Sequence, residues 1–72
     1  MPSIEFIRGE IERMRNRVNR QRREIMQLRH AGISTTSAEA LLGEMRNKVN
    51  DLCTERKRLT REQFRALEAR HW

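Results

Sequence analysis

Apolar residues recur at alternating steps of three and four on both sides of a single break in this 72-residue chain. Such spacing puts them on one stripe of an α-helix and is typical of a coiled-coil seam. The first stripe comprises Ile4, Ile7, Ile11, Met14, Val18, Gln21, Ile25 and Leu28. The second comprises Ala38, Leu42, Met45, Val49, Leu52, Arg56, Leu59, Gln63 and Ala66. The pattern predicts an all-α fold built from two amphipathic helices.

The break carries the signals that end one helix and begin another. Gly32 suits the left-handed residue that follows a helix. Thr36 and Glu39 have the spacing of a capping box, with Thr35 as an alternative N-cap, and Ser3 is a suitable N-cap for the first helix.

We therefore predict one domain over residues 1–72, with helices over about 4–31 and 37–70 and a loop over about 32–36. A connection of this length makes the helices antiparallel, which gives a two-helix, coiled-coil-like hairpin.

The register of the hairpin has two solutions. The favoured one pairs Leu28 with Leu42, Ile25 with Met45, Val18 with Leu52 and Ile11 with Leu59. A shift of about one turn pairs Val18 with Val49 instead. Gln21 lies within the first stripe, where it either fixes register or reaches out to solvent.

Two helices that meet along one seam cover each seam residue on one side only. Several apolar residues also lie off the seam: Phe6, Met26, Leu41, Cys53, Phe64 and Leu67. A second copy would cover them, so we predict a homo-oligomer, with a dimer that forms a four-helix bundle favoured. The alternative is a monomer on which these residues are ordinary surface.

Arginine dominates the charge of the chain, which has 16 Lys and Arg against 10 Asp and Glu and a net charge of +6. The candidate basic binding face comprises Arg8, Arg13, Arg15, Arg20, Arg22, Arg23, Arg29 and Arg46. Guanidinium groups pair with carboxylates or with phosphates, so we predict binding to an acidic protein partner, with DNA or RNA as the alternative. A structural element without a ligand is a third possibility. Local pairs such as Arg8 with Glu12, Arg20 with Glu24 and Arg58 with Glu62 would weaken each of the binding predictions.

Catalytic chemistry has little support in the sequence. Cys53 is the single cysteine, and the two histidines, His30 and His71, lie at helix ends, far from it in the predicted hairpin. The sequence has no zinc-ligand spacing and no phosphate-binding loop. We expect no enzyme activity, catalytic residue, metal, cofactor or small-molecule substrate. The chain also has no signal peptide and no membrane-spanning apolar run, which favours the cytoplasm over secretion or a membrane.

Several local motifs resemble a group of short alphaproteobacterial helical proteins of unknown function. These are Arg20-Gln21, the helix ending from Leu28 to Gly32, residues 35–42 (Thr-Thr-Ser-Ala-Glu-Ala-Leu-Leu) and residues 56–59 (Arg-Lys-Arg-Leu). The resemblance covers more than half of the chain. It implies a small bacterial two-helix protein and carries no activity or binding residue.

Overall fold

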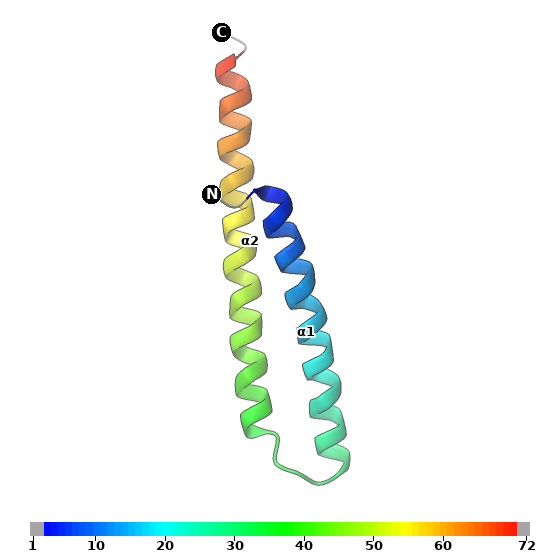
Figure 1. Cartoon of the computed structure of the whole chain (residues 1–72). Helices are drawn as coiled ribbons and strands as arrows, with labels where there is room; N and C mark the ends of the chain where they lie inside the picture. Colours follow the sequence, from blue (N-terminus) through cyan, green and yellow to red (C-terminus); the bar gives the residue numbers. More distant parts are fainter. Residues whose placement is uncertain (1–2, 71–72) are drawn as a thin grey trace.

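The computed structural model describes residues 3–70, which form an antiparallel hairpin of two helices (Figure 1). Helix α1 spans Ile4–His30 and helix α2 spans Thr36–Arg70. The two helices pack against each other in a rod of 64 × 16 × 15 Å. The predicted all-α hairpin and its turn at Gly32 are confirmed, and the predicted helix ends next to the loop differ by one residue. The two residues at each end of the predicted domain, 1–2 and 71–72, lie outside the described range.

Both ends of α1 are capped as the sequence predicts. The Ser3 hydroxyl accepts a hydrogen bond from the Phe6 amide at 3.1 Å. At the other end, Gly32 has a φ of +72°. The Ile33 amide donates to the Leu28 carbonyl at 2.9 Å, and the Gly32 amide donates to the Arg29 carbonyl at 3.1 Å. These two bonds form a Schellman motif, which satisfies carbonyls left free at the end of the helix.

The start of α2 differs from the predicted capping box. The Glu39 amide donates to the Thr35 carbonyl at 2.8 Å, so the alternative, Thr35, is the N-cap. The Glu39 carboxylate accepts a hydrogen bond from the Arg29 guanidinium at 2.6 Å, across the hairpin. The capping box of Thr36 and Glu39 is therefore wrong, because the charged guanidinium is a stronger donor than a backbone amide.

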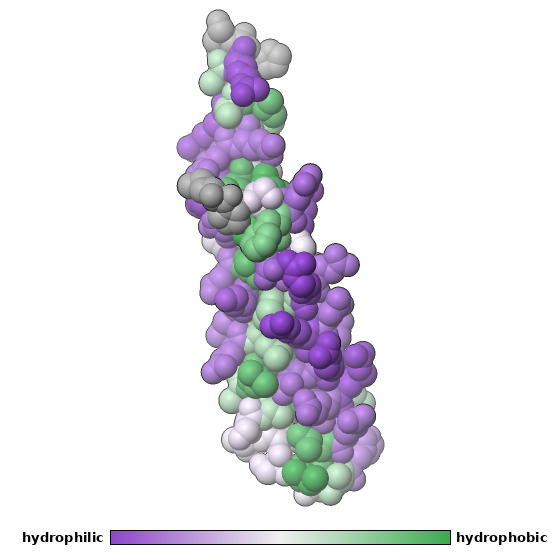
Figure 2. Space-filling model, in the orientation of Figure 1, coloured by the Kyte–Doolittle hydropathy of each residue, from purple (hydrophilic) through white to green (hydrophobic). Residues whose placement is uncertain are grey.

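The apolar seam is buried mainly on α1, where Ile7, Ile11 and Ile25 form the core. Every predicted seam residue of α1 is buried or half-buried. Within the described part of α2, no residue is fully buried, and its seam is half-buried from Ala38 to Leu59. On the face drawn in Figure 2, hydrophobic residues form a narrow line between hydrophilic flanks. The seam is thus partly open to solvent.

The last turns of α2 have no partner helix in this chain. Helix α2 has 35 residues against 27 in α1 and continues past the beginning of α1 (Figure 1). Residues 60–70 are all exposed. Gln63 and Ala66 have the spacing of the stripe, but they are exposed because α1 does not extend far enough to cover them.

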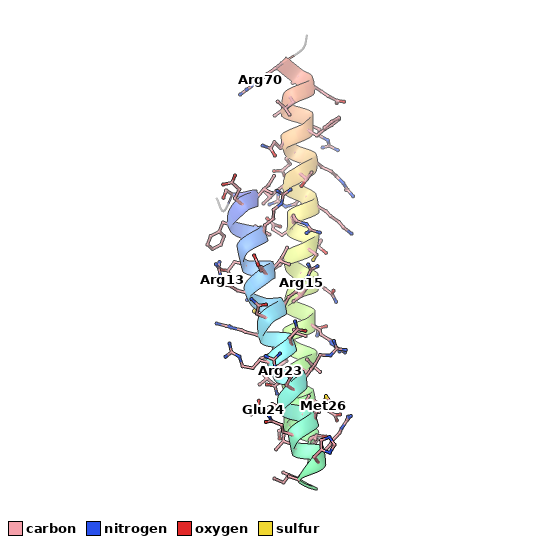
Figure 3. All side chains as sticks on the ribbon, turned by 90° about the vertical axis from the view of Figure 1, so that its right-hand side faces the viewer. Arg13, Arg15, Arg23, Glu24, Met26 and Arg70 are labelled. Carbon is pink, nitrogen blue, oxygen red and sulfur yellow. The ribbon has the colours of Figure 1, made fainter. Side chains whose placement is uncertain are left out.

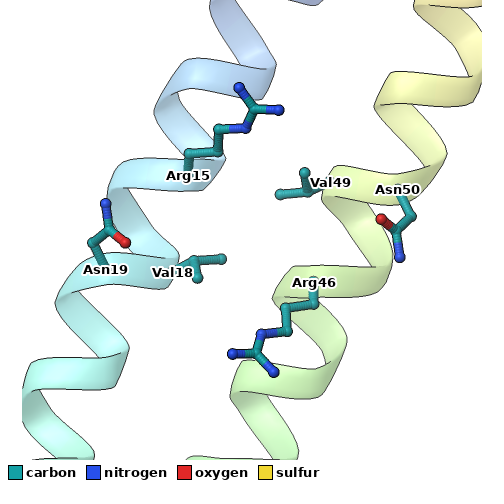
Figure 4. A pocket seen from close by; sticks show the side chains of 6 residues that line it. All are labelled: Arg15, Val18, Asn19, Arg46, Val49 and Asn50. Carbon is teal, nitrogen blue, oxygen red and sulfur yellow. The ribbon is translucent and has the colours of Figure 1, made fainter.

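The register follows the alternative prediction. Val18 and Val49 point toward each other from the two helices (Figure 4). The Gln21 side chain is 7% exposed, and its Nε2 donates to the Ala38 carbonyl at 3.1 Å. The favoured register, which pairs Val18 with Leu52, is wrong. Gln21 does not reach solvent, and its bond to the Ala38 carbonyl ties α1 to the first turn of α2.

The seam divides the surface of the hairpin into two long sides. Arg15 and Met26 project from one side of α1, whereas Arg13 and Glu24 project from the other (Figure 3). We call the first the groove side, because the hollows between the helices open on it. We call the second the paired side, because its arginines form ion pairs within the hairpin.

Alanine substitutions at two glycines are expected to change stability in opposite directions. Gly32→Ala forces a β-carbon into a left-handed conformation and should lower the free energy of unfolding by about 1–2 kcal/mol. Gly43→Ala is the matched control, because Gly43 lies inside α2 and an added β-carbon would meet nothing within 4 Å. It should raise stability by about 0.5–1 kcal/mol. Urea unfolding at one fixed protein concentration measures both, and two changes of the same sign would contradict the description of the turn.

Loss of the Gln21 amide should destabilise the hairpin. Gln21→Ala removes a buried side chain and its bond to Ala38, at a cost of about 1–2 kcal/mol. Gln27→Ala is the control on the same helix, since Gln27 is exposed, and it should change stability by less than about 0.5 kcal/mol. Equal effects of the two substitutions in urea unfolding would show that Gln21 does not hold the register.

Candidate functional site

Two hollows lie between α1 and α2 on the groove side. The first has a volume of about 310 Å³ and is lined by Arg15, Val18, Asn19, Arg46, Val49 and Asn50 (Figure 4). The second has a volume of about 200 Å³ and is lined by Arg22, Ile25, Met26, Arg29, Glu39 and Leu42. Both are built around seam residues with arginines beside them. We refer to the two hollows together as the arginine groove.

The first hollow combines an apolar floor with cationic rims. Val18 and Val49 form the floor, and both are half-buried members of the seam. Arg15 lies on the α1 rim and Arg46 on the α2 rim, and both guanidinium groups extend toward the space between the helices (Figure 4). Guanidinium groups donate to planar or tetrahedral anions, so this hollow can hold a carboxylate or a phosphate group above an apolar surface.

The lining comes from a repeated hexapeptide. Residues 14–19 read Met-Arg-Asn-Arg-Val-Asn, and residues 45–50 read Met-Arg-Asn-Lys-Val-Asn. Because the helices are antiparallel, the two copies face each other about an approximate two-fold axis through the Val18–Val49 contact. The roles of Asn19, Val49 and Asn50 in this hollow were not predicted, although the repeat is visible in the sequence and pairs Val18 with Val49.

The ion pairs leave most rim arginines without a carboxylate. Over residues 3–70, the pairs are Arg13–Glu10, Arg29–Glu39, and Arg58 with Glu55 and Glu62. The predicted Arg58–Glu62 pair is confirmed, whereas Arg8–Glu12 and Arg20–Glu24 do not form within this range. Arg15, Arg22 and Arg46 likewise make no ion pair in the described part of the chain. The groove therefore carries uncompensated positive charge.

The paired side has a different electrostatic character. Arg13 lies on it (Figure 3). On α2, Glu55, Arg58 and Glu62 lie on it too, because their helical positions are on the other flank of the seam from Glu39 and Arg46, which line the groove. The hydrogen bond from Arg58 lowers the pKa of Glu55, and the two carboxylates raise the pKa of Arg58. Since the pKa of Glu55 is lowered, this exposed pair favours the helix at pH values above the ordinary carboxylate pKa, and its contribution is lost as the pH falls to the lowered pKa. Ion pairs within the hairpin thus neutralise Arg13 and Arg58 on this side.

The predicted basic face divides between different surfaces. Arg15, Arg22, Arg29 and Arg46 line the groove, and Arg8 shares their side of α1 because it precedes Arg15 by seven residues. Arg20 and Arg23 line a separate hollow on α1 with Glu24 and Gln27, and Arg13 lies on the paired side. Arg46 shares its hollow with Arg15.

Most of the candidate oligomer contacts are exposed, as expected from their positions off the seam. Phe6, Met26, Leu41, Phe64 and Leu67 are each 43–62% exposed, and Cys53 is half-buried. Met26 lines the groove rather than standing alone on the surface. The loop residue Ile33, which is 56% exposed, was not among the predicted contacts.

Residues 3–70 contain no cluster of three or more His, Cys, Asp or Glu side chains that could hold a metal ion. Neither helix is long and apolar enough over this range to cross a membrane. His30 is exposed at the end of α1, and Cys53 is a free thiol in α2. The second histidine, His71, lies outside the described residues.

The chain matches no family model, no curated protein and no solved structure. The resemblance to the alphaproteobacterial group therefore stays a prediction, and the geometry of the groove carries the functional argument.

Proposed function

We propose that this chain is a non-enzymatic, self-associating interaction module that binds an acidic protein partner through its arginine-rich groove side. One observation carries the proposal: Arg15, Arg22 and Arg46 surround an apolar floor and have no carboxylate partner within residues 3–70. Arginines whose only role is to keep the protein in solution would not need to gather around one hollow. A bacterial cytoplasmic location and membership of the alphaproteobacterial group belong to this proposal and rest on the sequence.

Self-association is supported by the incomplete burial of the seam. The described part of α2 contributes no fully buried residue, and Phe6 and Leu41 are exposed apolar side chains. Seven-residue periodicity puts both on the paired side, where ion pairs have already neutralised much of the charge. Contact between two groove sides would instead bring arginine against arginine. We therefore propose that two hairpins pack through their paired sides into a four-helix bundle and leave both grooves open.

An acidic protein fits the groove better than a nucleic acid. The floor of Val18 and Val49 gains stability by covering apolar side chains, which a phosphate backbone does not supply. Nucleic-acid binding remains the alternative, because the net charge of +6 would attract DNA or RNA at low salt.

Substitutions on the paired side are expected to dissociate the dimer. Phe6→Gln combined with Leu41→Gln should raise the dimer dissociation constant about tenfold or more in sedimentation equilibrium. Met26→Gln is the control, since Met26 is similarly exposed but lies in the groove, and it should leave the constant within about twofold. A wild-type protein that stays monomeric at high micromolar concentration would overturn self-association, and an equal effect of Met26→Gln would overturn the choice of side.

Binding to acidic polymers should depend on the groove arginines. We expect an acidic peptide that combines glutamates with leucines to bind the wild-type protein more tightly than duplex DNA or RNA at about 150 mM salt, because long-range attraction is screened and only the peptide covers the apolar floor. Arg15→Glu with Arg22→Glu should abolish that binding in fluorescence anisotropy. Tighter binding of DNA or RNA at this salt concentration, confirmed by gel shift, would establish the nucleic-acid alternative and reject the acidic-protein proposal.

A further inference from the structure

The geometry points to one kind of occupant for the arginine groove: an acidic amphipathic helix of another protein, with carboxylates spaced seven residues apart. This inference rests on the proposed function and adds the shape and charge pattern of the partner. Three features carry it, namely the spacing of the rim arginines, the apolar floor and the positive charge that the hairpin itself leaves uncompensated.

The spacing of the α1 rim matches the repeat of a second helix. Arg15, Arg22 and Arg29 follow one another at seven-residue intervals, which are about 10.5 Å apart along a helix. A helix that lies along the groove presents its own residues i, i+7 and i+14 at the same interval. Arg29 is already bonded to Glu39 at 2.6 Å, so Arg15 and Arg22 are the open positions on this rim. Carboxylates at i and i+7 of the partner would pair with these two arginines.

The opposite rim and the floor define the rest of the pattern. Arg46 stands on the α2 rim, across the first hollow from Arg15. Arg46 can therefore pair with one further carboxylate, on the other flank of the partner helix. Between the rims, the floor runs from Val18 and Val49 to Ile25 and Leu42, with the exposed Met26 beside it. Apolar residues at the i, i+3, i+4 and i+7 positions of a helix would cover this floor.

A helix satisfies both requirements at once, which other acidic ligands do not. Its apolar stripe would cover the floor, while its flanking carboxylates would reach the guanidinium groups on both rims. The groove between two helices is itself the type of surface into which a third helix packs. A second hairpin that docks by its own groove is disfavoured, because its arginines would meet these arginines.

Designed peptides of three heptads test the inference. The first carries glutamates at seven-residue intervals beside a leucine stripe, and the second has the same composition with the glutamates on the opposite face. A third replaces each glutamate with glutamine. We expect the first to bind wild-type protein about tenfold or more tightly than either of the others in fluorescence anisotropy at about 150 mM salt.

Paired substitutions then locate the site. Arg15→Glu with Arg46→Glu should weaken binding of the first peptide about tenfold or more, and Arg15→Ala with Arg46→Ala should weaken it in the same direction. Arg20→Glu with Arg23→Glu is the matched control, because it changes the same charge at the separate hollow of α1, and it should weaken binding by less than about threefold. Circular dichroism checks that each variant is helical.

The outcomes separate this inference from the proposed function. If the glutamate peptides bind equally, or if the two charge-reversal pairs weaken binding equally, the acidic-partner function stands and the helix in the groove is rejected. If no acidic peptide binds the wild-type protein, both are rejected. If the groove substitutions lower self-association instead of peptide binding, a second copy occupies the groove and the inference is wrong.

Discussion

The apolar contact between α1 and α2 is the one interaction on which the rest of the structure depends. A hairpin of two helices has a single seam, so each helix can cover its neighbour from one direction only. Ile7, Ile11 and Ile25 are buried, whereas the α2 seam stays half-buried. The same contact defines the groove, because the rims exist only where the two helices lie side by side. A change of register would move Arg46 away from Arg15 and remove the site.

Local features of the fold could be predicted from the sequence because they depend on neighbouring residues. The Ser3 cap, the left-handed Gly32 and the seam positions follow from side-chain type and helical spacing. The capping box failed because Glu39 has a second possible partner, Arg29, which is near it only in the folded hairpin. The exposure of Gln63 and Ala66 could not be predicted from their spacing, because a repeating pattern on one helix carries no information about where the other helix begins.

Register could not be decided from hydrophobicity alone. Val18 packs equally well against a leucine or a valine, so shifts of about one turn differ little in apolar burial. The residues that line the hollows together, Val18 with Val49 and Ile25 with Leu42, distinguish the solutions. The hexapeptide repeat at residues 14–19 and 45–50 supplies all six residues that line the first hollow.

The candidate site was only partly predictable for the same reason. The predicted basic face included the groove-side residues Arg8, Arg15, Arg22 and Arg29, but it grouped them with Arg13, Arg20 and Arg23, which the structure places elsewhere. What distinguishes the groove arginines is their shared apolar floor and, for Arg15, Arg22 and Arg46, the lack of a carboxylate partner within residues 3–70. Both properties depend on which residues of α2 lie opposite. The two sides of the hairpin therefore suit different partners: the paired side a second hairpin, and the groove side an acidic helix.

Nuclear Overhauser effects between valine and leucine methyl groups test the register most directly. In a methyl-labelled sample, we predict a strong cross-peak between Val18 and Val49. Isotope filtering in a mixed labelled and unlabelled sample assigns that cross-peak to one chain. A strong intramolecular cross-peak between Val18 and Leu52, with none to Val49, would contradict the register and the groove built on it.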